Sequence, residues 1–596
     1  MLQRNYDQWP PKNFQYQEIL NTYGMESKNS FYYDSEIEYI AEIVKERLYF
    51  GSTYSEGFRT IQSTTETIYF CTDEEFVYMN YYFDFGPLNL SCLYKFCCKL
   101  NSYLSSPTIK RIVYYASADA RKRANAAYLI GCFAVIYLNM PPRKIYQTLL
   151  SAGGVYKNFV DASQGVSSYT LRLLDCFQAI EKARAFNFFN FKDFNCLEYD
   201  TYDKIQNGDL NWLLPRKFIA FIGPTDCEFM NGHAPEFYLK YFLRNDVKSV
   251  IRLNNKVYDA NAFIQAGIAH YELFFADGTT PTKPILMRFL DISEHSPAAI
   301  AVHCKAGLGR TGSLIGAYII KHYHLSAREA IAWMRICRPG SVIGQQQGWL
   351  EKIEPWLWKQ GTQYRMNHFG DGDKIPKFRF GVYSKEWPLE RKRMIILAQK
   401  NIKNAEDKKK FRMPSPAPPR FTPLSQKPLL NVSKQKRPES ERKRTEADKE
   451  RELYRFTKLL SKPQLQLNDE NRSDNVIVGT KHVNCQTDKL QKGPRNFGEI
   501  DEYYRKKKHK DKLEMEKTQG DRLNDIKANR FGETKAKLNG ERPRWQETDK
   551  EVLQVNTKNA KQTPLYGAAL EKMFSQKLKR QLDTATHHPA VKNTLN

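Results

Sequence analysis

The hydrophobic positions divide the chain into two patterned stretches and one long stretch without a pattern. Between about residues 213 and 360, short apolar runs alternate with amphipathic segments. Strands are predicted near 218–222, 249–253, 271–275 and 298–302, and helices near 235–243, 259–267, 284–293 and 314–320. A Ser-Ala-Arg-Glu capping box at 326–329 begins a further helix. This alternation is typical of a mainly parallel sheet flanked by helices.

A second, weaker pattern covers residues 31–186. It predicts a helix from Ser35, strands near 47–51, 67–71, 77–83 and 111–115, and a buried helix over 125–138. An offset of 185 residues aligns Leu129 with Leu314, and the segment RLYFGST resembles RKFIAFIG, which opens the later stretch. We therefore predict two tandem copies of one α/β unit.

The remaining segments differ in composition. Residues 1–30 form an N-terminal extension, residues 187–212 a polar, acidic and aromatic linker, and residues 361–390 an extension of the folded core. Residues 391–596 hold 49 Lys and Arg against 27 Asp and Glu, whereas the first 390 residues hold 43 against 39. This basic tail has too few apolar residues to offset the entropy of ordering, so we expect disorder, with local helix over 440–460 and 501–517.

The cysteines and apolar runs bear on location. Eleven cysteines are scattered without a CxxC pair or a metal-ligand spacing, which favours a reducing compartment and predicts neither a metal nor a cofactor. The longest apolar run, 126–138, is too short to span a bilayer. An intracellular, soluble protein without a membrane contact is expected.

The chemistry is concentrated in HCKAGLGRTG, residues 303–312. A predicted strand precedes this glycine-rich turn and a predicted helix follows it, so backbone N–H groups and the helix dipole create an anion site. Cys304 is then a nucleophile whose pKa is lowered to roughly 4–7. Arg310 can grip two phosphate oxygens. The predicted phosphate-binding loop comprises Lys305, Ala306, Gly307, Leu308, Gly309 and Thr311, with His303 ordering it.

Further groups would complete a hydrolase. Asp277, on a glycine-flanked turn after a strand of the same sheet, is the predicted general acid and later the base for water. Gln346 and Gln347 are candidates for positioning that water. The first copy has Asp119 at the position of Cys304 and Asn125 at that of Arg310, so we expect it to be an inactive scaffold.

Three motifs in order, FFADGTTPT, HCKAGLGRTG and CRPGSVIG, closely resemble the cell division cycle 14 dual-specificity phosphatases over about 31–360. The resemblance implies two tandem phosphatase-like domains, the second catalytic, with Cys304, Arg310 and Asp277 at the active-site positions. It also implies a linker groove, placed at Asp200, Asp203 and Asp209, that selects phosphoserine-proline followed by a basic residue. The family loop has proline where this chain has Gln345.

The resemblance further implies action on phosphoserine, phosphothreonine and phosphotyrosine, with substrates made by proline-directed cell-cycle kinases. A nuclear or cytoplasmic location is expected, at the spindle, centrosome or basal body. Three alternatives remain at this point: a phosphoinositide phosphatase of the tensin type, a phosphopeptide-binding scaffold, and a tail that binds nucleic acid, cytoskeletal filaments or import receptors through basic runs at 436–444 and 505–510.

Overall fold

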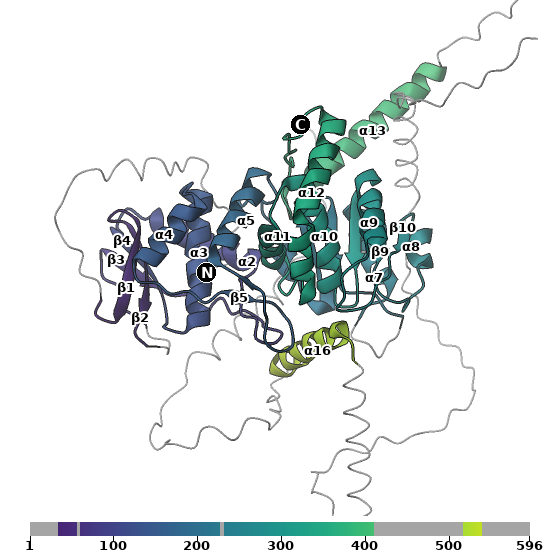
Figure 1. Cartoon of the computed structure of the whole chain (residues 1–596). Coiled ribbons are helices and arrows are strands. Elements are labelled where there is room, and N and C mark those ends of the chain that lie inside the picture. Colours follow the sequence, from purple (N-terminus) through teal and green to yellow (C-terminus); the bar gives the residue numbers. More distant parts are fainter. Residues whose placement is uncertain (1–33, 56–59, 227–231, 411–516, 539–596) are drawn as a thin grey trace, which may run out of the picture. The chain divides into compact units, whose positions relative to one another are not determined.

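The computed structural model describes residues 34–55, 60–226, 232–410 and 517–538 (Figure 1). The first domain contains β1 (Ile37–Val44), β2 (Leu48–Thr53), β3 (Thr67–Phe70), α2 (Leu90–Leu104), β4 (Arg111–Ala116), α3 (Ala120–Tyr137), α4 (Pro142–Ser151), β5 (Phe159–Val160), β6 (Thr170–Leu171) and α5 (Leu173–Ala185). A linker with α6 (Cys196–Tyr202) and the 3-10 turn η3 (Ile205–Asn207) follows.

The second domain and the helices after it complete the described fold. They are β7 (Leu210–Leu214), β8 (Phe218–Phe221), α7 (Pro235–Arg244), β9 (Val247–Arg252), α8 (Asn261–Gln265), β10 (Ala269–Glu272), α9 (Lys283–His295), β11 (Ala299–His303), α10 (Gly309–Tyr323), α11 (Ala327–Cys337), α12 (Gln345–Phe369), α13 (Glu386–Lys410) and α16 (Gln519–Leu538). The elements predicted at 218–222, 235–243, 249–253, 284–293 and 298–302 are confirmed within a few residues.

Four strands have the same order and direction in the two sheets, and the second sheet has β10 as an additional edge strand. The first has the order β1-β2-β4-β3 and the second the order β10-β9-β11-β8-β7. In each sheet an antiparallel edge strand, β1 or β7, precedes strands that pair in parallel. The two strand-turn-helix units β4–α3 and β11–α10 are therefore equivalent, which confirms the tandem α/β prediction.

The two domains share a hydrophobic core in which α5 packs against α11. Trp333 of α11 is fully buried, and its Nε1 donates to the carbonyl of Leu213 at 2.8 Å. Phe188 and Phe189 of the linker pack against Trp333 with ring centroids 5.6 and 5.8 Å apart. The aromatic half of the linker is thus core, because burying these rings removes a large apolar area from water.

Two predictions for the first domain were wrong. The segment after Ser35 is strand β1, not a helix, because its buried side chains alternate along the chain and its hydrogen bonds go to β2. Glu46, with φ of 56°, makes the tight return between these strands. The segment 77–83 forms no strand, and the Asp84 carboxylate instead accepts hydrogen bonds from the backbone N–H groups of Tyr81 and Tyr82 at 2.8 Å.

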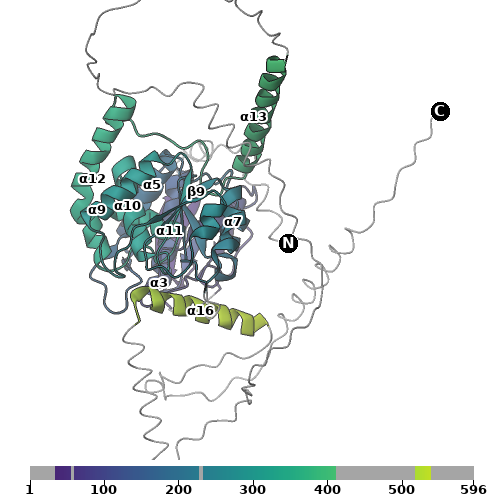
Figure 2. The ribbon, with the colours of Figure 1, turned by 90° about the vertical axis from the view of Figure 1, so that its right-hand side faces the viewer.

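The expectation of disorder over 391–596 does not hold for the described parts of that range. Helix α13 extends to Lys410, and α16 is a separate helix whose residues up to Gly532 belong to the same compact unit as the two domains (Figures 1 and 2). Several predictions for the tail lie outside the described residues: the local helix at 440–460, nearly all of that at 501–517, and the basic runs at 436–444 and 505–510. Within the described part of the chain, no helix has the length and apolar character needed to cross a bilayer.

Candidate active site

The predicted phosphate-binding loop lies where the parallel strands of the second sheet end. It connects β11 to α10, and the turns after β9 and β10 lie beside it at the same sheet edge, the usual ligand position in α/β folds. Gly307 has φ of 67°, and a Cβ there would overlap the carbonyl oxygen of Phe221. Only glycine therefore fits this close approach of the loop to β8.

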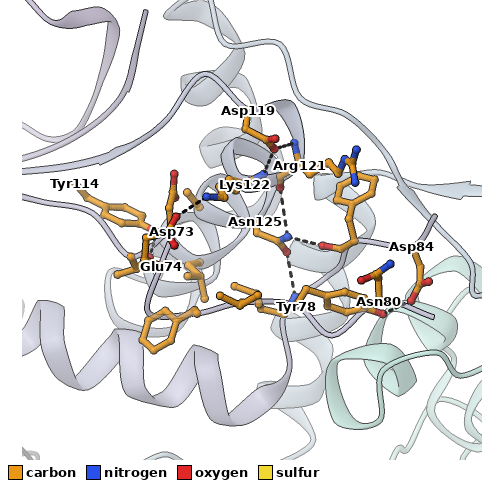
Figure 3. A pocket seen from close by; sticks show the side chains of 17 residues that line it. Asp73, Glu74, Tyr78, Asn80, Asp84, Tyr114, Asp119, Arg121, Lys122 and Asn125 are labelled. Atoms are coloured by element: carbon orange, nitrogen blue, oxygen red, sulfur yellow. Dashed lines mark hydrogen bonds and ion pairs between the residues drawn. The ribbon is translucent and has the colours of Figure 1, made fainter. Parts of the chain in front are cut away.

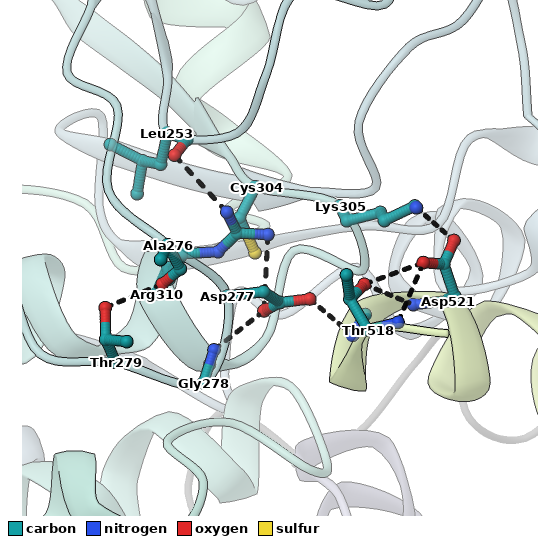
Figure 4. A network of polar contacts seen from close by, with 12 residues as sticks. Leu253, Ala276, Asp277, Gly278, Thr279, Cys304, Lys305, Arg310, Thr518 and Asp521 are labelled. Carbon is teal, nitrogen blue, oxygen red and sulfur yellow. Dashed lines mark hydrogen bonds and ion pairs between the residues drawn. The ribbon is translucent and has the colours of Figure 1, made fainter. Parts of the chain in front are cut away.

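Cys304 is 3% exposed at the start of this loop. Burial alone would raise the pKa of its thiol, but the positive charge of Arg310 and hydrogen bonding from Thr311 outweigh burial, and the net effect lowers the pKa. Figure 4 shows the Cys304 sulfur beside the Arg310 guanidinium. The thiolate needed for nucleophilic attack is therefore favoured by its surroundings.

Arg310 is held by the ends of neighbouring strands. Its Nη1 donates to the carbonyl oxygen of Phe275 at 3.0 Å, and its Nη2 lies 3.3 Å from Oδ1 of Asp277. Its Nε is buried and has no hydrogen-bond partner among the described residues. The guanidinium is thus fixed by the protein on one side and retains a buried donor that a phosphate oxygen can use.

Asp277 lies on the turn after β10, with its side chain 14% exposed, and faces Arg310 (Figure 4). The turn is held from α12, because Nε2 of Gln345 donates to the Gly278 carbonyl at 2.8 Å and Nε2 of Gln346 to the Thr279 carbonyl at 3.1 Å. The structure therefore brings Cys304, Arg310 and Asp277 together, as the sequence predicted.

His303 is fully buried behind the loop. One ring nitrogen, Nδ1, lies 2.9 Å from the Cys304 carbonyl oxygen, and the other, Nε2, lies 2.7 Å from the Tyr258 hydroxyl. A carbonyl only accepts, so Nδ1 carries the proton and Nε2 accepts from Tyr258. Burial lowers the pKa of His303 to about 3, so the ring is neutral. These are the contacts that a loop-ordering role requires.

The two glutamines predicted to position water have different surroundings. The Gln346 amide lies against Gly309 of the phosphate-binding loop, where an added Cβ would stand 2.9 Å from Oε1. Gln347 instead accepts from Arg335 Nη2 at 2.5 Å, and its own Nε2 donates to Gly344 at 3.1 Å. Gln346 therefore adjoins the reaction site directly, and the contacts of Gln347 tie it to the turn before α12.

The three linker carboxylates also have different partners. Asp200 pairs with Lys95 of the first domain at 2.7 Å and accepts from Ser91 at 2.5 Å. Asp203 accepts from Asn211 at 2.8 Å, and burial raises its pKa. Asp209 is 5% exposed and adjoins the phosphate-binding loop through Arg338. Among these three, Asp209 is the one that the structure connects to the loop.

Arg338 makes that connection. Its Nη1 donates to Oδ1 of Asp209 at 2.8 Å, its Nε to the Gly307 carbonyl at 2.9 Å and its Nη2 to the Ala306 carbonyl at 3.1 Å. Sequence reasoning assigned no role to Arg338 or Tyr258. Their functional contacts depend on segments far apart in the chain, although the position of Arg338 within CRPGSVIG was a usable signal.

The equivalent place in the first domain is a cavity of about 360 Å³ (Figure 3). Asp119, which the 185-residue offset sets against Cys304, is the residue directly before α3, the place that Leu308 has before α10. It caps α3 by accepting hydrogen bonds from the backbone N–H groups of Arg121 and Lys122 at 2.8 and 2.9 Å. Asn125, which aligns with Arg310, donates to the Phe85 carbonyl at 2.5 Å. A carboxylate of the protein thus lies at the helix N-terminus, the position that an anion would take. That the first copy is inactive stays a prediction.

Comparisons with known proteins agree with this geometry. A family model described as the N-terminal half of dual specificity protein phosphatases matches residues 42–183, and one described as a polymorphic toxin system DSP-PTPase phosphatase matches residues 230–324. Dual specificity protein phosphatase CDC14C of Homo sapiens is 48% identical over 328 residues, which cover 54% of this chain and 72% of the relative. The chain belongs to the CDC14 family.

Other CDC14 relatives give the same result. CDC14AB of Danio rerio is 52% identical over 339 residues, 56% of this chain and 55% of the relative. CDC14A of Homo sapiens is 51% identical over 331 residues, 54% of this chain and 55% of the relative. The chain therefore spans about half the length of these two CDC14 proteins. The resemblance based on the three motifs is confirmed.

Proposed function

We propose that this protein is a phosphatase that hydrolyses phosphoserine, phosphothreonine and phosphotyrosine esters of proteins through a phosphocysteine at Cys304. The single observation that carries this proposal is the convergence of a thiol of lowered pKa, a fixed guanidinium and a carboxyl group at one sheet edge. Cysteine, arginine and aspartate in this arrangement supply a nucleophile, a phosphate clamp and a proton donor.

The reaction has two steps. The Cys304 thiolate attacks phosphorus, a sulfur–phosphorus bond forms, and the ester oxygen leaves with a proton from Asp277. Asp277, now a carboxylate, takes a proton from water as that water attacks phosphorus. The sulfur–phosphorus bond breaks, and inorganic phosphate leaves. Arg310 binds the equatorial oxygens of the transferring group in both steps.

The proposed substrates are phosphoproteins made by proline-directed kinases, with phosphoserine before proline and a basic residue downstream. Asp209 supports this choice because Arg338 engages only Oδ1 of its buried carboxylate, so that Oδ2 and the second lone pair of the Ala306 carbonyl can accept from a further ammonium or guanidinium group. Asp200 and Asp203 lie on α6 and at its end, and stay part of the proposed groove.

A kinetic panel tests this specificity. Phosphopeptides that vary the phosphoresidue, the following proline and a downstream lysine are compared on wild type, Asp209→Asn, Asp203→Asn and Asp200→Asn. We expect Asp209→Asn to reduce the lysine preference in kcat/KM about tenfold, equal to about 1.4 kcal/mol. Asp200→Asn should have the least effect, because Asp200 contacts Lys95 and Ser91 of the first domain rather than the phosphate-binding loop. A lysine preference that survives all three substitutions contradicts the groove assignment.

The structure offers less support for a phosphoinositide phosphatase. Leu308 is 1% exposed in an apolar cluster, where a loop for a polyanionic headgroup would favour a second lysine beside Lys305. Phosphoinositides assayed beside the phosphopeptides separate the two activities. For the basic tail we propose targeting contacts with nucleic acid, filaments or import receptors, in the nucleus or cytoplasm. Deleting 391–596, which removes the basic runs at 436–444 and 505–510, should then move the protein without lowering peptide turnover.

A further inference from the structure

We infer that residues 518–530, which lie in the described tail segment 517–538, are an intramolecular ligand of the active site and hold it closed against substrates. This inference rests on the proposed function, whose reaction site the segment covers. The segment comprises Thr518 and the first three turns of α16. From its N-terminus onward, its contacts reach Asp277, the phosphate-binding loop, Asp209 and loops of the first domain.

The start of α16 engages the proton donor. The backbone N–H of Gly520 donates to Oδ2 of Asp277 at 2.6 Å, while Oδ1 of the same carboxylate faces Arg310 (Figure 4). Both carboxylate oxygens are therefore occupied by donors of the protein, and the group cannot face a leaving oxygen. A Cβ on residue 520 would stand 2.7 Å from Lys305 Cβ and 2.8 Å from Asp277 Oδ2, so only glycine allows this approach.

The next residue supplies a negative charge at the rim of the loop. Oδ1 of Asp521 forms an ion pair with Nζ of Lys305 (Figure 4), and Oδ2 of Asp521 accepts a hydrogen bond from Thr518 Oγ1 at 2.8 Å. The pair with Lys305 lowers the pKa of Asp521 against the opposing effect of burial. A carboxylate of the tail thus neutralises the lysine that would otherwise attract a phosphate ester.

Two residues after Asp521, a leucine of the helix faces the protein. Leu523 is 2% exposed and packs with Ala162, Ala306, Leu308 and Ile343. Ala162 belongs to the first domain and the other three to the second, so Leu523 fills an apolar recess formed by both. A leucine that is fully removed from water indicates a stable docked position.

Lys527 then enters the position proposed for the substrate's basic residue. Its Nζ pairs with the Asp209 carboxylate and donates to the Ala306 carbonyl at 3.1 Å, and the residue is 5% exposed. Lysine is almost never buried to this degree unless its charge is paired. Asp521 and Lys527 are six helical residues apart, about 9 Å at 1.5 Å per residue, a span that about three residues of an extended peptide also cover.

Arg522 and Arg530 extend the contact to the first domain. Arg522 donates to the Gln164 side chain, and Arg530 donates to the Asn80 carbonyl and lies 4.8 Å from the Tyr81 ring centroid. The segment therefore places a carboxylate beside Lys305 and an ammonium beside Asp209, in the order that a phosphopeptide with a downstream lysine would present its own charges. A substrate and the segment cannot occupy this surface together.

Two measurements on the full chain test the inference. One is kcat/KM for a phosphoserine-proline peptide with a downstream lysine. The other is the rate of Cys304 alkylation by iodoacetamide, followed by mass spectrometry, which needs no phosphatase activity. The variants are Leu523→Asp, which puts a charge into the apolar recess, and Gly520→Ala, which favours helix but clashes with Lys305 and Asp277. Asn529→Asp, on the exposed side of α16, introduces the same charge as a matched control.

We expect Leu523→Asp and Gly520→Ala to raise both kcat/KM and the Cys304 alkylation rate about tenfold, with Asn529→Asp equal to wild type. Unchanged rates in both variants would overturn the inference. Faster Cys304 alkylation in variants that hydrolyse the peptide, but no faster than wild type, would also overturn it. If alkylation rises but no variant hydrolyses any phosphopeptide, the docked segment stands and the proposed function fails. If the ratio of the variant rate to the wild-type rate changes with protein concentration, the surface is covered by the segment of a second copy instead.

Discussion

Arg338 Nη1 lies 2.8 Å from Asp209 Oδ1, while Nε of the same guanidinium donates to the Gly307 carbonyl in the phosphate-binding loop. Both side chains are almost completely buried. The position of the linker carboxylate and the shape of the loop are therefore set by one group, and a change at either residue should affect both the stability of the fold and the choice of substrate.

Replacing Arg338 by methionine should lower the free energy of unfolding by about 1–3 kcal/mol, because the Gly307 carbonyl loses its Arg338 donor and the buried Asp209 carboxylate keeps only the Lys527 ammonium as a charged partner. Urea unfolding measures this loss. Arg379→Met is the matched control, since Arg379 is 72% exposed where it pairs with Glu390, and an exposed pair contributes about 1 kcal/mol or less. Equal losses in the two variants would show that Arg338 is not a structural link.

The pKa of Cys304 can be measured from the pH dependence of its alkylation. Because the thiol pKa is lowered in the folded protein, the thiolate should persist to lower pH than an ordinary cysteine thiolate and disappear only as the pH falls through the lowered pKa. Arg310→Ala removes the main charge that lowers the pKa, so the midpoint should move up and the rate at pH 7 should fall about tenfold per pKa unit. Arg310→Lys retains a positive charge and should keep the midpoint low. A midpoint that is the same in Arg310→Ala as in wild type would contradict this electrostatic account.

Asp277→Asn should distinguish substrates by their leaving groups. A serine alkoxide needs a proton as it leaves, so turnover of a phosphoserine peptide should fall about 10²–10⁴-fold. An aryl phosphate whose phenol is acidic needs little assistance and should lose far less. Steady-state kinetics with both substrates measures the difference. Parallel losses for the two would mean that Asp277 does not donate the proton.

Gln346 and Gln347 should differ in the second step. Gln346→Ala removes the amide beside Gly309 and should slow hydrolysis of the phosphocysteine, which gives a burst of released alcohol before a slower steady state. Gln347→Ala removes the acceptor of Arg335 and should mainly reduce stability, without a burst. Rapid-quench kinetics tests this, and a burst in the Gln347 variant alone would reverse the two roles.

Much of the second domain follows from its sequence, because its buried parallel strands are continuous apolar runs and its phosphate-binding loop has a fixed spacing. The strand β1 was predicted as a helix because Ile37, Ile40, Ala41 and Val44 also satisfy a helical period. The segment is a strand because it pairs with β2, and such pairing cannot be read from the pattern of one segment alone.

The site was predictable where its residues adjoin a motif, and less so where a contact joins distant segments. Arg338 meets Asp209 across 129 positions, and Lys527 meets it across 318. Nothing in the local composition near residue 520 separates α16 from the rest of the basic tail. Helix α16 is held by the surface against which it packs, and a local sequence pattern does not reveal that surface.

The most direct test of the central claim is mass spectrometry of the acid-quenched enzyme during turnover of a phosphoserine-proline peptide. The account predicts a phosphoryl group on Cys304 in wild type, and neither label nor turnover in Cys304→Ser, which still binds the phosphopeptide. Turnover that proceeds without phosphorylated Cys304, or that survives in Cys304→Ser, would contradict it.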